Sequence, residues 1–215
     1  MKSRNILKII KKAIAKSQLK DKITSRSNYV YNRTLAKAYA EAYAESPNLK
    51  EYPLFKENDC TNFISQVLVA GGMKMEGTDY RKVTDWFCYT KDAMALRKVS
   101  LTWRGSQYFR MYWGNKNGEG NNMANEYREL TVEEAIAKFD ELYKYLMIGD
   151  VIQYADSNQN VYHSQVIHSK EFNVSLNMYD IFIAQHSVNR KHVSLYQYLK
   201  LLRNKKARYV YIYHF

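Results

Sequence analysis

A change in sequence pattern near Ile148 constrains the fold more than any other feature of this chain. Up to that point apolar residues recur at helical spacing, and a capping box at Thr131 opens a helix expected to run to about Leu146. After it come short β-branched and aromatic runs separated by Asp, Ser and Asn turns. Helices followed by antiparallel strands are typical of an α+β fold, so we expect N-terminal helices packed on a small antiparallel β-sheet. The expected strands are Val151–Tyr154, Tyr162–His168, Ile181–His186 and Arg208–His214.

Three further helices can be bounded from the sequence. Asp59 and Ser194 have side chains suited to helix N-caps, and a glycine pair is suited to ending a helix. The segment from Gly77 to Gly120 is rich in Trp and Tyr and is expected to be irregular. The helices are expected from Tyr29 to Glu45, from near Cys60 to the pair Gly71-Gly72, and from Leu195 to Leu202.

The first 28 residues differ from the rest of the chain. Residues 1–22 carry eight Lys/Arg against the single acid Asp21, with apolar residues on one helical face. This pattern predicts a cationic amphipathic helix, which either packs against the domain or contacts a membrane surface or an anionic wall polymer. Lysines interrupt what would be the apolar core of a secretory signal, so no signal peptide is expected. We therefore expect a basic extension over residues 1–28 and one domain over residues 29–215.

The net charge of +12 favours polyanionic partners. Nucleic acid, an anionic membrane and an anionic wall polymer all fit this charge. No helix-turn-helix, zinc-finger or RNA-recognition motif is present, so specific nucleic-acid binding is not expected. No apolar run is long enough for a transmembrane helix. Two cysteines cannot form a four-ligand zinc site by themselves, and we expect no metal or cofactor.

Cys60 is the strongest candidate for a reactive side chain. It follows Asp59 at the first turn of a predicted helix, where unpaired N–H groups and the helix dipole favour the thiolate. The same geometry offers the backbone N–H of Cys60 as a donor to an oxyanion. Cys88 lies in an aromatic run and is expected to be a buried core thiol.

A cysteine hydrolase also needs an imidazole base and a polar group that orients it. His163 is the best placed of the five histidines, because it begins a predicted strand just past a turn. His186 and Gln185 end the next strand and are the candidates for the orienting group. Adjacent strand residues point to opposite faces, so only one of the two can face His163. The alternative is that the cysteine and histidine are structural, since such pairs arise often by chance.

The chain resembles the putative amidase domain of Gram-positive bacteria, a relative of the NlpC/P60 and CHAP cysteine peptidases with a papain-like fold. The resemblance spans about residues 29–215. It depends on a set of short motifs that occur in the family's order. The Asp-Cys-Thr-Asn-Phe block is specific in combination with the Gly-Asp-Val and His-Ser motifs, and any one of them alone would be weak. The motifs are Tyr31-Asn32-Arg33, Ala38-Tyr39-Ala40-Glu41, Asn58-Asp59-Cys60-Thr61-Asn62-Phe63-Ile64-Ser65-Gln66 with Gly71-Gly72, Trp103, Gly149-Asp150-Val151, His163-Ser164 and Ala184-Gln185-His186.

The resemblance implies a papain-like NlpC/P60-type fold, a Cys60 nucleophile and a His163 general base. It implies a third polar residue on the following strand, for which we expect His186, with Gln185 as the alternative. Around the oxyanion and substrate we expect Tyr52, Asp59 and Trp103.

The resemblance also implies a substrate and a location. The expected reaction is amide hydrolysis in the stem peptide or cross-bridge of bacterial peptidoglycan, without a cofactor. The competing expectation is a non-catalytic cell-wall-binding module of the same fold. Relatives that act on the wall are exported, so an extracellular or wall location is expected even though no signal peptide is visible.

Overall fold

The computed structural model describes residues 30–114, 121, 123–203, 205 and 207–215. The chain divides into two compact units, Met1–Tyr31 and Asn32–Phe215, and all features below belong to the second. The amphipathic helix predicted over residues 1–22, and the extension 1–28 that contains it, lie outside the described residues.

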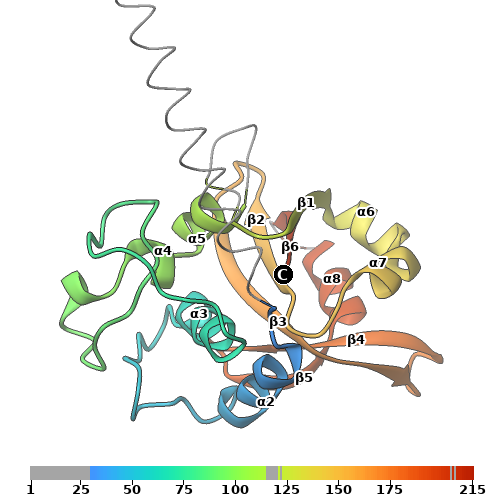
Figure 1. Cartoon of the computed structure of the whole chain (residues 1–215). Coiled ribbons are helices and arrows are strands. Elements are labelled where there is room, and N and C mark those ends of the chain that lie inside the picture. Colours follow the sequence, from blue (N-terminus) through green and yellow to red (C-terminus); the bar gives the residue numbers. More distant parts are fainter. Residues whose placement is uncertain (1–29, 115–120, 122, 204, 206) are drawn as a thin grey trace, which may run out of the picture. The chain divides into compact units, whose positions relative to one another are not determined.

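The second unit is built on an antiparallel six-stranded sheet (Figure 1). The strand order is β1-β6-β2-β3-β4-β5, so the last strand of the chain lies between the first and the second. This arrangement confirms the expected α+β class with an antiparallel sheet. The strands are β1 (Glu126–Thr131), β2 (Val151–Asp156), β3 (Val161–Asn173), β4 (Met178–Gln185), β5 (Arg190–Ser194) and β6 (Ala207–His214).

Helices cover both faces of the sheet. Figure 1 shows α3 (Cys60–Ala70) and α5 (Ser106–Trp113) on one side, and α6 (Val132–Ala137) and α8 (Leu195–Arg203) on the other. Strand β2 is therefore buried along nearly its whole length, and its residues are apolar or hydrogen-bonded on both faces. Isoleucines of β2, β3, β4 and β6 pack with leucines of α8 into one apolar cluster.

Helix α3 is buried all round, and its ends follow from its sequence. At the C-terminal end the N–H of Gly72 bonds to Val69 O and the N–H of Met73 bonds to Leu68 O. These bonds form a Schellman motif that requires a positive φ, and Gly72 has φ +100°. The predicted stop at the glycine pair is confirmed. At the other end Asp59 occupies the N-cap position, but its side chain makes no capping bond. That carboxylate is used elsewhere, as described below.

The remaining helices confirm some predictions and correct others. Helix α2 (Arg33–Tyr43) is capped by Asn32, whose side chain accepts from Leu35 N, and Ser194 caps α8 by accepting from Gln197 N. The capping box at Thr131 is present, but the single helix predicted after it is two helices, α6 and α7 (Phe139–Tyr145).

The segment predicted to be irregular contains regular structure. It holds a 3-10 turn (Leu96–Lys98), α4 (Leu101–Arg104) and α5. Its tryptophans Trp86, Trp103 and Trp113 are fully buried, and Trp86 contacts each of the other two, so this segment has its own aromatic core. Among the described residues, no helix combines the length and apolar character needed to cross a lipid bilayer.

Candidate active site around Cys60

Cys60 is the first residue of α3 and is almost completely buried. Its Sγ lies 3.8 Å from Thr61 Oγ1 and 3.9 Å from Ser106 Oγ. The N–H groups in the first turn of a helix have no acceptor within the helix. The backbone N–H of Cys60 therefore points out of the N-terminal end of α3. The sulfur is thus at a helix end among hydrogen-bond donors.

The electrostatic surroundings of Cys60 favour the thiolate. Burial alone raises the pKa of this thiol, but a hydrogen bond from the His163 imidazole and its charge, with smaller contributions from Thr61 and the Ser164 backbone, lower the pKa from 9.0 to about 7. Cys88 shows the opposite outcome. Burial raises the pKa of Cys88 to about 11, and its Sγ donates to the Thr90 carbonyl at 3.3 Å.

His163 is the third residue of strand β3 and is also buried. Its Nε2 lies 3.2 Å from Oε1 of Gln185, at the end of the neighbouring strand β4. With Nε2 directed at an amide oxygen, Nδ1 is the ring nitrogen left for the Cys60 thiol. The structure therefore brings together Cys60, His163 and Gln185.

A chain of amide hydrogen bonds fixes the orientation of Gln185. Its Nε2 donates to the carbonyl of Val188 at 3.0 Å, so Oε1 must be the atom that faces His163. That oxygen also accepts from Gln165 Nε2 at 2.7 Å, and Gln165 Oε1 accepts from the hydroxyl of Tyr154. Because Oε1 can only accept, Nε2 of His163 carries a proton and Nδ1 is the base in the neutral ring.

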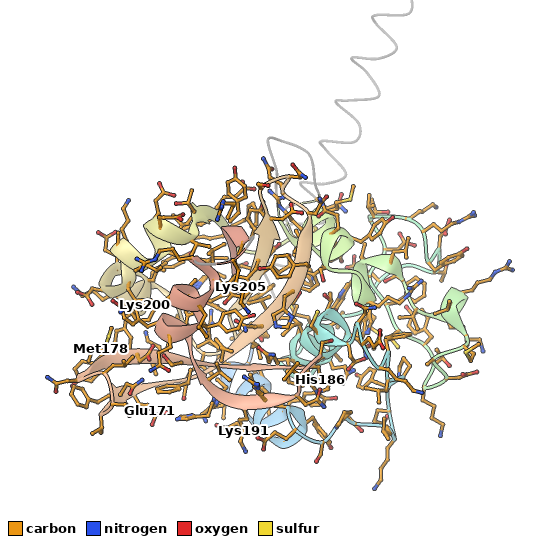
Figure 2. The ribbon with its side chains drawn as sticks, turned by 180° about the vertical axis from the view of Figure 1, so that it is seen from behind. Glu171, Met178, His186, Lys191, Lys200 and Lys205 are labelled. Carbon is orange, nitrogen blue, oxygen red and sulfur yellow. The ribbon has the colours of Figure 1, made fainter. Side chains whose placement is uncertain are left out.

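His186 does not face His163, which corrects our preference for it as the orienting residue. It points to the opposite side of β4, as the alternation of strand residues requires. Its Nδ1 lies 2.5 Å from Oδ2 of Asp59, and its Nε2 donates to the Tyr43 carbonyl at 2.8 Å. The ring stacks on Phe63 at 4.1 Å between centroids. Figure 2, seen from behind, shows His186 beside α3, at the end of the hairpin away from Met178.

Asp59 and Trp103 are buried supports of the α3 N-terminus. Asp59 Oδ1 accepts from the backbone N–H of Phe55 and from Asn62 Nδ2, each at 2.8 Å. Trp103 Nε1 donates to Asn62 Oδ1 at 2.7 Å, and its ring is fully buried. Neither side chain is accessible to a substrate in this arrangement, so the structure corrects their expected place around the substrate.

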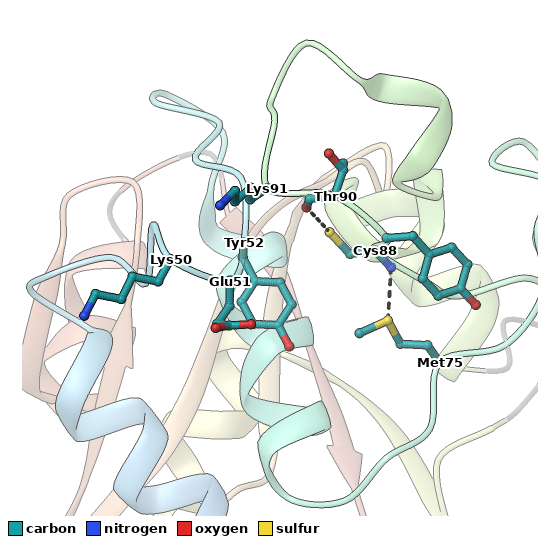
Figure 3. Close-up of a pocket in the computed structure, with 8 residues that line it drawn as sticks. Lys50, Glu51, Tyr52, Met75, Cys88, Thr90 and Lys91 are labelled. Atoms are coloured by element: carbon teal, nitrogen blue, oxygen red, sulfur yellow. Dashed lines mark hydrogen bonds between the residues drawn. The ribbon is translucent and has the colours of Figure 1, made fainter.

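Tyr52 lines a pocket of about 330 Å³ together with Cys88 (Figure 3). Its ring stacks on Trp103 with centroids 5.7 Å apart. Burial, followed by the charge of Cys88, raises the pKa of Tyr52 to about 12, so the phenol is neutral and can donate a hydrogen bond. The expected role of Tyr52 near an oxyanion stays a prediction.

A second set of hydroxyl and amide groups surrounds Cys60, and sequence reasoning missed it. Thr61 Oγ1 lies 2.9 Å from Ser106 Oγ and 3.0 Å from Ser164 Oγ, and Gln153 Nε2 donates to Ser164 Oγ at 2.8 Å. Tyr213 in turn donates to Gln153 Oε1 at 2.5 Å. This network joins α3, α5 and the sheet behind the sulfur. Only the pairing of β2 with β3 and β6 could have indicated it.

A pocket of about 360 Å³ lies next to His163 on the α8 side of the sheet. Within the part of the chain that the structure describes, no three His, Cys, Asp or Glu side chains converge as they would around a metal ion. The lining of the pocket combines the imidazole with aromatic and polar side chains: Tyr162, His163, Gln185, Ser187, Val188, Arg190 and Tyr198.

A thiol and an imidazole held at the junction of a buried helix and an antiparallel sheet are equipped for covalent cleavage of an acyl bond. Comparison with known families shows an amidase domain. Residues 30–213 match the family described as "Putative amidase domain", and the chain belongs to that family. It is therefore an amidase-type hydrolase domain. No curated protein and no solved structure matches the chain.

Proposed function

We propose that this protein is a cysteine-dependent amide hydrolase in which Cys60 is the nucleophile and His163 the general base. The observation that supports this most strongly is the position of the Cys60 thiol at the start of α3, where the neighbouring His163 imidazole lowers the pKa of the thiol to about 7. Gln185 is the proposed orienting residue, because it holds His163 in the tautomer whose Nδ1 can accept the thiol proton.

In the proposed reaction, Cys60 transfers its proton to His163 and the sulfur attacks the carbonyl carbon of the amide. The oxyanion accepts from the Cys60 backbone N–H at the positive end of α3. The C–N bond then breaks, His163 protonates the leaving amine, and a thioester remains on Cys60. Water, deprotonated by His163, attacks the thioester and releases a carboxylic acid and the free thiol.

The proposed substrate is an amide bond in the stem peptide or cross-bridge of bacterial peptidoglycan, and the proposed fold relationship is to the papain-like NlpC/P60 group. The charge of +12 supports an anionic wall polymer as the partner. A wall or extracellular site of action follows from this substrate. The signature motifs that carry the resemblance lie at the site, in Asp59-Cys60 and in His163-Ser164.

The test is release of new amines from purified peptidoglycan by the full chain, with two matched cysteine variants. We expect Cys60→Ala to lower the rate by about 10³-fold or more, because the covalent step is lost. Cys88→Ala should retain activity, since that thiol is buried, donates a hydrogen bond to the Thr90 carbonyl and has a raised pKa. Equal activity of Cys60→Ala and the unmodified protein would contradict the mechanism. Tight sedimentation with wall material but no amine release from any version would favour the binding module.

A further inference from the structure

The described lining of the pocket beside His163 carries a permanent positive charge. Arg190 is its one permanently charged lining residue, and none of the described lining residues is acidic. The Arg190 side chain is exposed and therefore available to a ligand. A guanidinium presents planar pairs of N–H donors that match a carboxylate in a bidentate geometry.

The turn that presents Arg190 is fixed by the same residues that build the site. Arg190 pairs with Gln185 in the β4–β5 register, and Gln185 also bonds to the carbonyl of Val188 within this turn. The backbone N–H of Asp59 donates to Ser187 Oγ at 2.8 Å. Ser187 and Val188 both have positive φ, of 58° and 80°. Such strain at a non-glycine residue, above all at a β-branched one, persists only where the surroundings impose it, and it is common at binding sites.

The position of the pocket indicates which part of a substrate it receives. His163 lines it whereas Cys60 does not, and His163 is the group that gives a proton to the leaving amine. Tyr198, on α8, lines the pocket and is influenced electrostatically by both Cys60 and Arg190. Burial raises the pKa of Tyr198, the charges of Tyr162 and Cys60 raise it further, and the charge of Arg190 lowers it. The phenol therefore lies within the electrostatic reach of both Cys60 and Arg190.

We propose that this pocket binds the leaving-amine side of the substrate and that Arg190 recognises a carboxylate carried by that side. This inference builds on the proposed function and names the substrate class: an amide whose amine half is an amino acid or peptide with a free carboxylate. The rings of Tyr162 and Tyr198 offer apolar walls to the side chain of that residue. Ser187 keeps a hydroxyl hydrogen to donate while its oxygen accepts from Asp59.

The decisive experiment measures protection of Cys60 from alkylation, and it does not require hydrolysis. Iodoacetamide is neutral, so changes in protein charge do not alter its encounter with the thiol. The probes are dialanine, in its L,L and D,D forms, and the corresponding dialanine amides, which lack the carboxylate. We expect at least one form of dialanine to protect at a concentration about tenfold lower than its amide, a difference of about 1.4 kcal/mol.

Three variants make the result specific. Arg190→Gln should abolish the difference between dialanine and its amide, and Arg190→Lys should keep part of it, because the charge remains without the planar fork. Arg203→Gln is the matched control, because it removes the same charge from an exposed position on α8 and should keep the full difference. Equal protection by acid and amide in the unmodified protein, no protection by either, or a preference that survives Arg190→Gln would each overturn the proposal.

A parallel hydrolysis assay separates this proposal from the proposed function. Peptidoglycan fragments with a free or an amidated carboxylate on the leaving side should differ in kcat/KM by about tenfold, and Arg190→Gln should remove the difference. Hydrolysis that depends on Cys60 but has the same kcat/KM for the free and the amidated carboxylate would refute the carboxylate subsite alone. Carboxylate-dependent protection without any hydrolysis would refute the proposed function while supporting the subsite.

Discussion

Cys60 and Cys88 are both buried, yet their surroundings give their thiols opposite character. Burial raises the pKa of each thiol, and at Cys88 only a hydrogen bond with the Thr90 backbone opposes it, so its pKa is about 11. At Cys60 the His163 imidazole, Thr61 and the Ser164 backbone outweigh burial, so its pKa is about 7. Reactivity is thus set by what faces the sulfur and not by exposure.

This difference predicts the pH dependence of alkylation at Cys60. Only the thiolate reacts, and it forms above the pKa, so the rate at Cys60 should rise through about pH 7. In His163→Ala the two largest contributions that lower the pKa are lost, while burial, Thr61 and the Ser164 backbone remain, so the midpoint should move upward from about 7. The measurement is iodoacetamide labelling against pH, followed by mass spectrometry of the Cys60 peptide in a Cys88→Ala background. A midpoint near 9 in the protein with His163 intact would contradict the thiol–imidazole pair.

Gln185 and His186 are adjacent, and their variants should separate catalysis from stability. Gln185→Ala should lower kcat by about tenfold or more, because His163 loses the acceptor that holds its tautomer. His186→Ala should lower the free energy of unfolding by about 3 kcal/mol, because Asp59 is left as a buried carboxylate without its partner. Urea unfolding and steady-state kinetics on each variant test both statements. A lower kcat in His186→Ala with an unchanged free energy of unfolding would indicate that His186, and not Gln185, orients the His163 ring.

At the level of elements, the sequence predicts buried strands better than edge strands. Strands β2, β3, β4 and β6 were expected because their β-branched and aromatic residues are typical of a sheet interior. The edge strands β1 and β5 were not, because their sequences, EYRELT and RKHVS, are largely polar and charged. Edge strands of natural sheets commonly carry charges that discourage pairing with other chains, and this removes the usual strand pattern.

The same contrast applies to the elements of the candidate site. Cys60 and His163 lie at predicted element ends, so their local sequence identifies them. The choice between Gln185 and His186 depends on which face of β4 meets His163, and an irregularity in the β4–β5 pairing lies between Ile183 and Gln185. Ser106 belongs to α5, a helix without a recognisable cap, and it reaches Cys60 only through the tertiary fold. Such contacts between distant segments cannot be read from local patterns.

At the level of the whole Asn32–Phe215 unit, Arg33 joins three segments that are distant in sequence. From the start of α2 its guanidinium donates to Asp150 Oδ1 at 2.8 Å and to the Ile148 carbonyl at 2.7 Å, and its other nitrogen bonds to the Phe215 carbonyl. Asp150 is fully buried and also lies 2.8 Å from Nδ1 of His214 through Oδ2. The Arg33 and Gly149-Asp150 motifs therefore have a structural role in this chain. They connect α2, the start of β2 and the end of β6.

Replacing Arg33 should destabilise the unit without removing the site chemistry. In Arg33→Gln the buried carboxylate of Asp150 keeps His214 at Oδ2 but loses the guanidinium at Oδ1, so we expect the free energy of unfolding to fall by about 3 kcal/mol. Arg81→Gln is the matched control: its guanidinium is exposed and lies 3.9 Å from Asp79, and such pairs contribute about 0–1 kcal/mol. Urea unfolding of both variants measures the difference, and Cys60 alkylation at low urea should keep its midpoint near pH 7 in both. Similar unfolding free energies for the two variants would show that Arg33 does not hold these segments together.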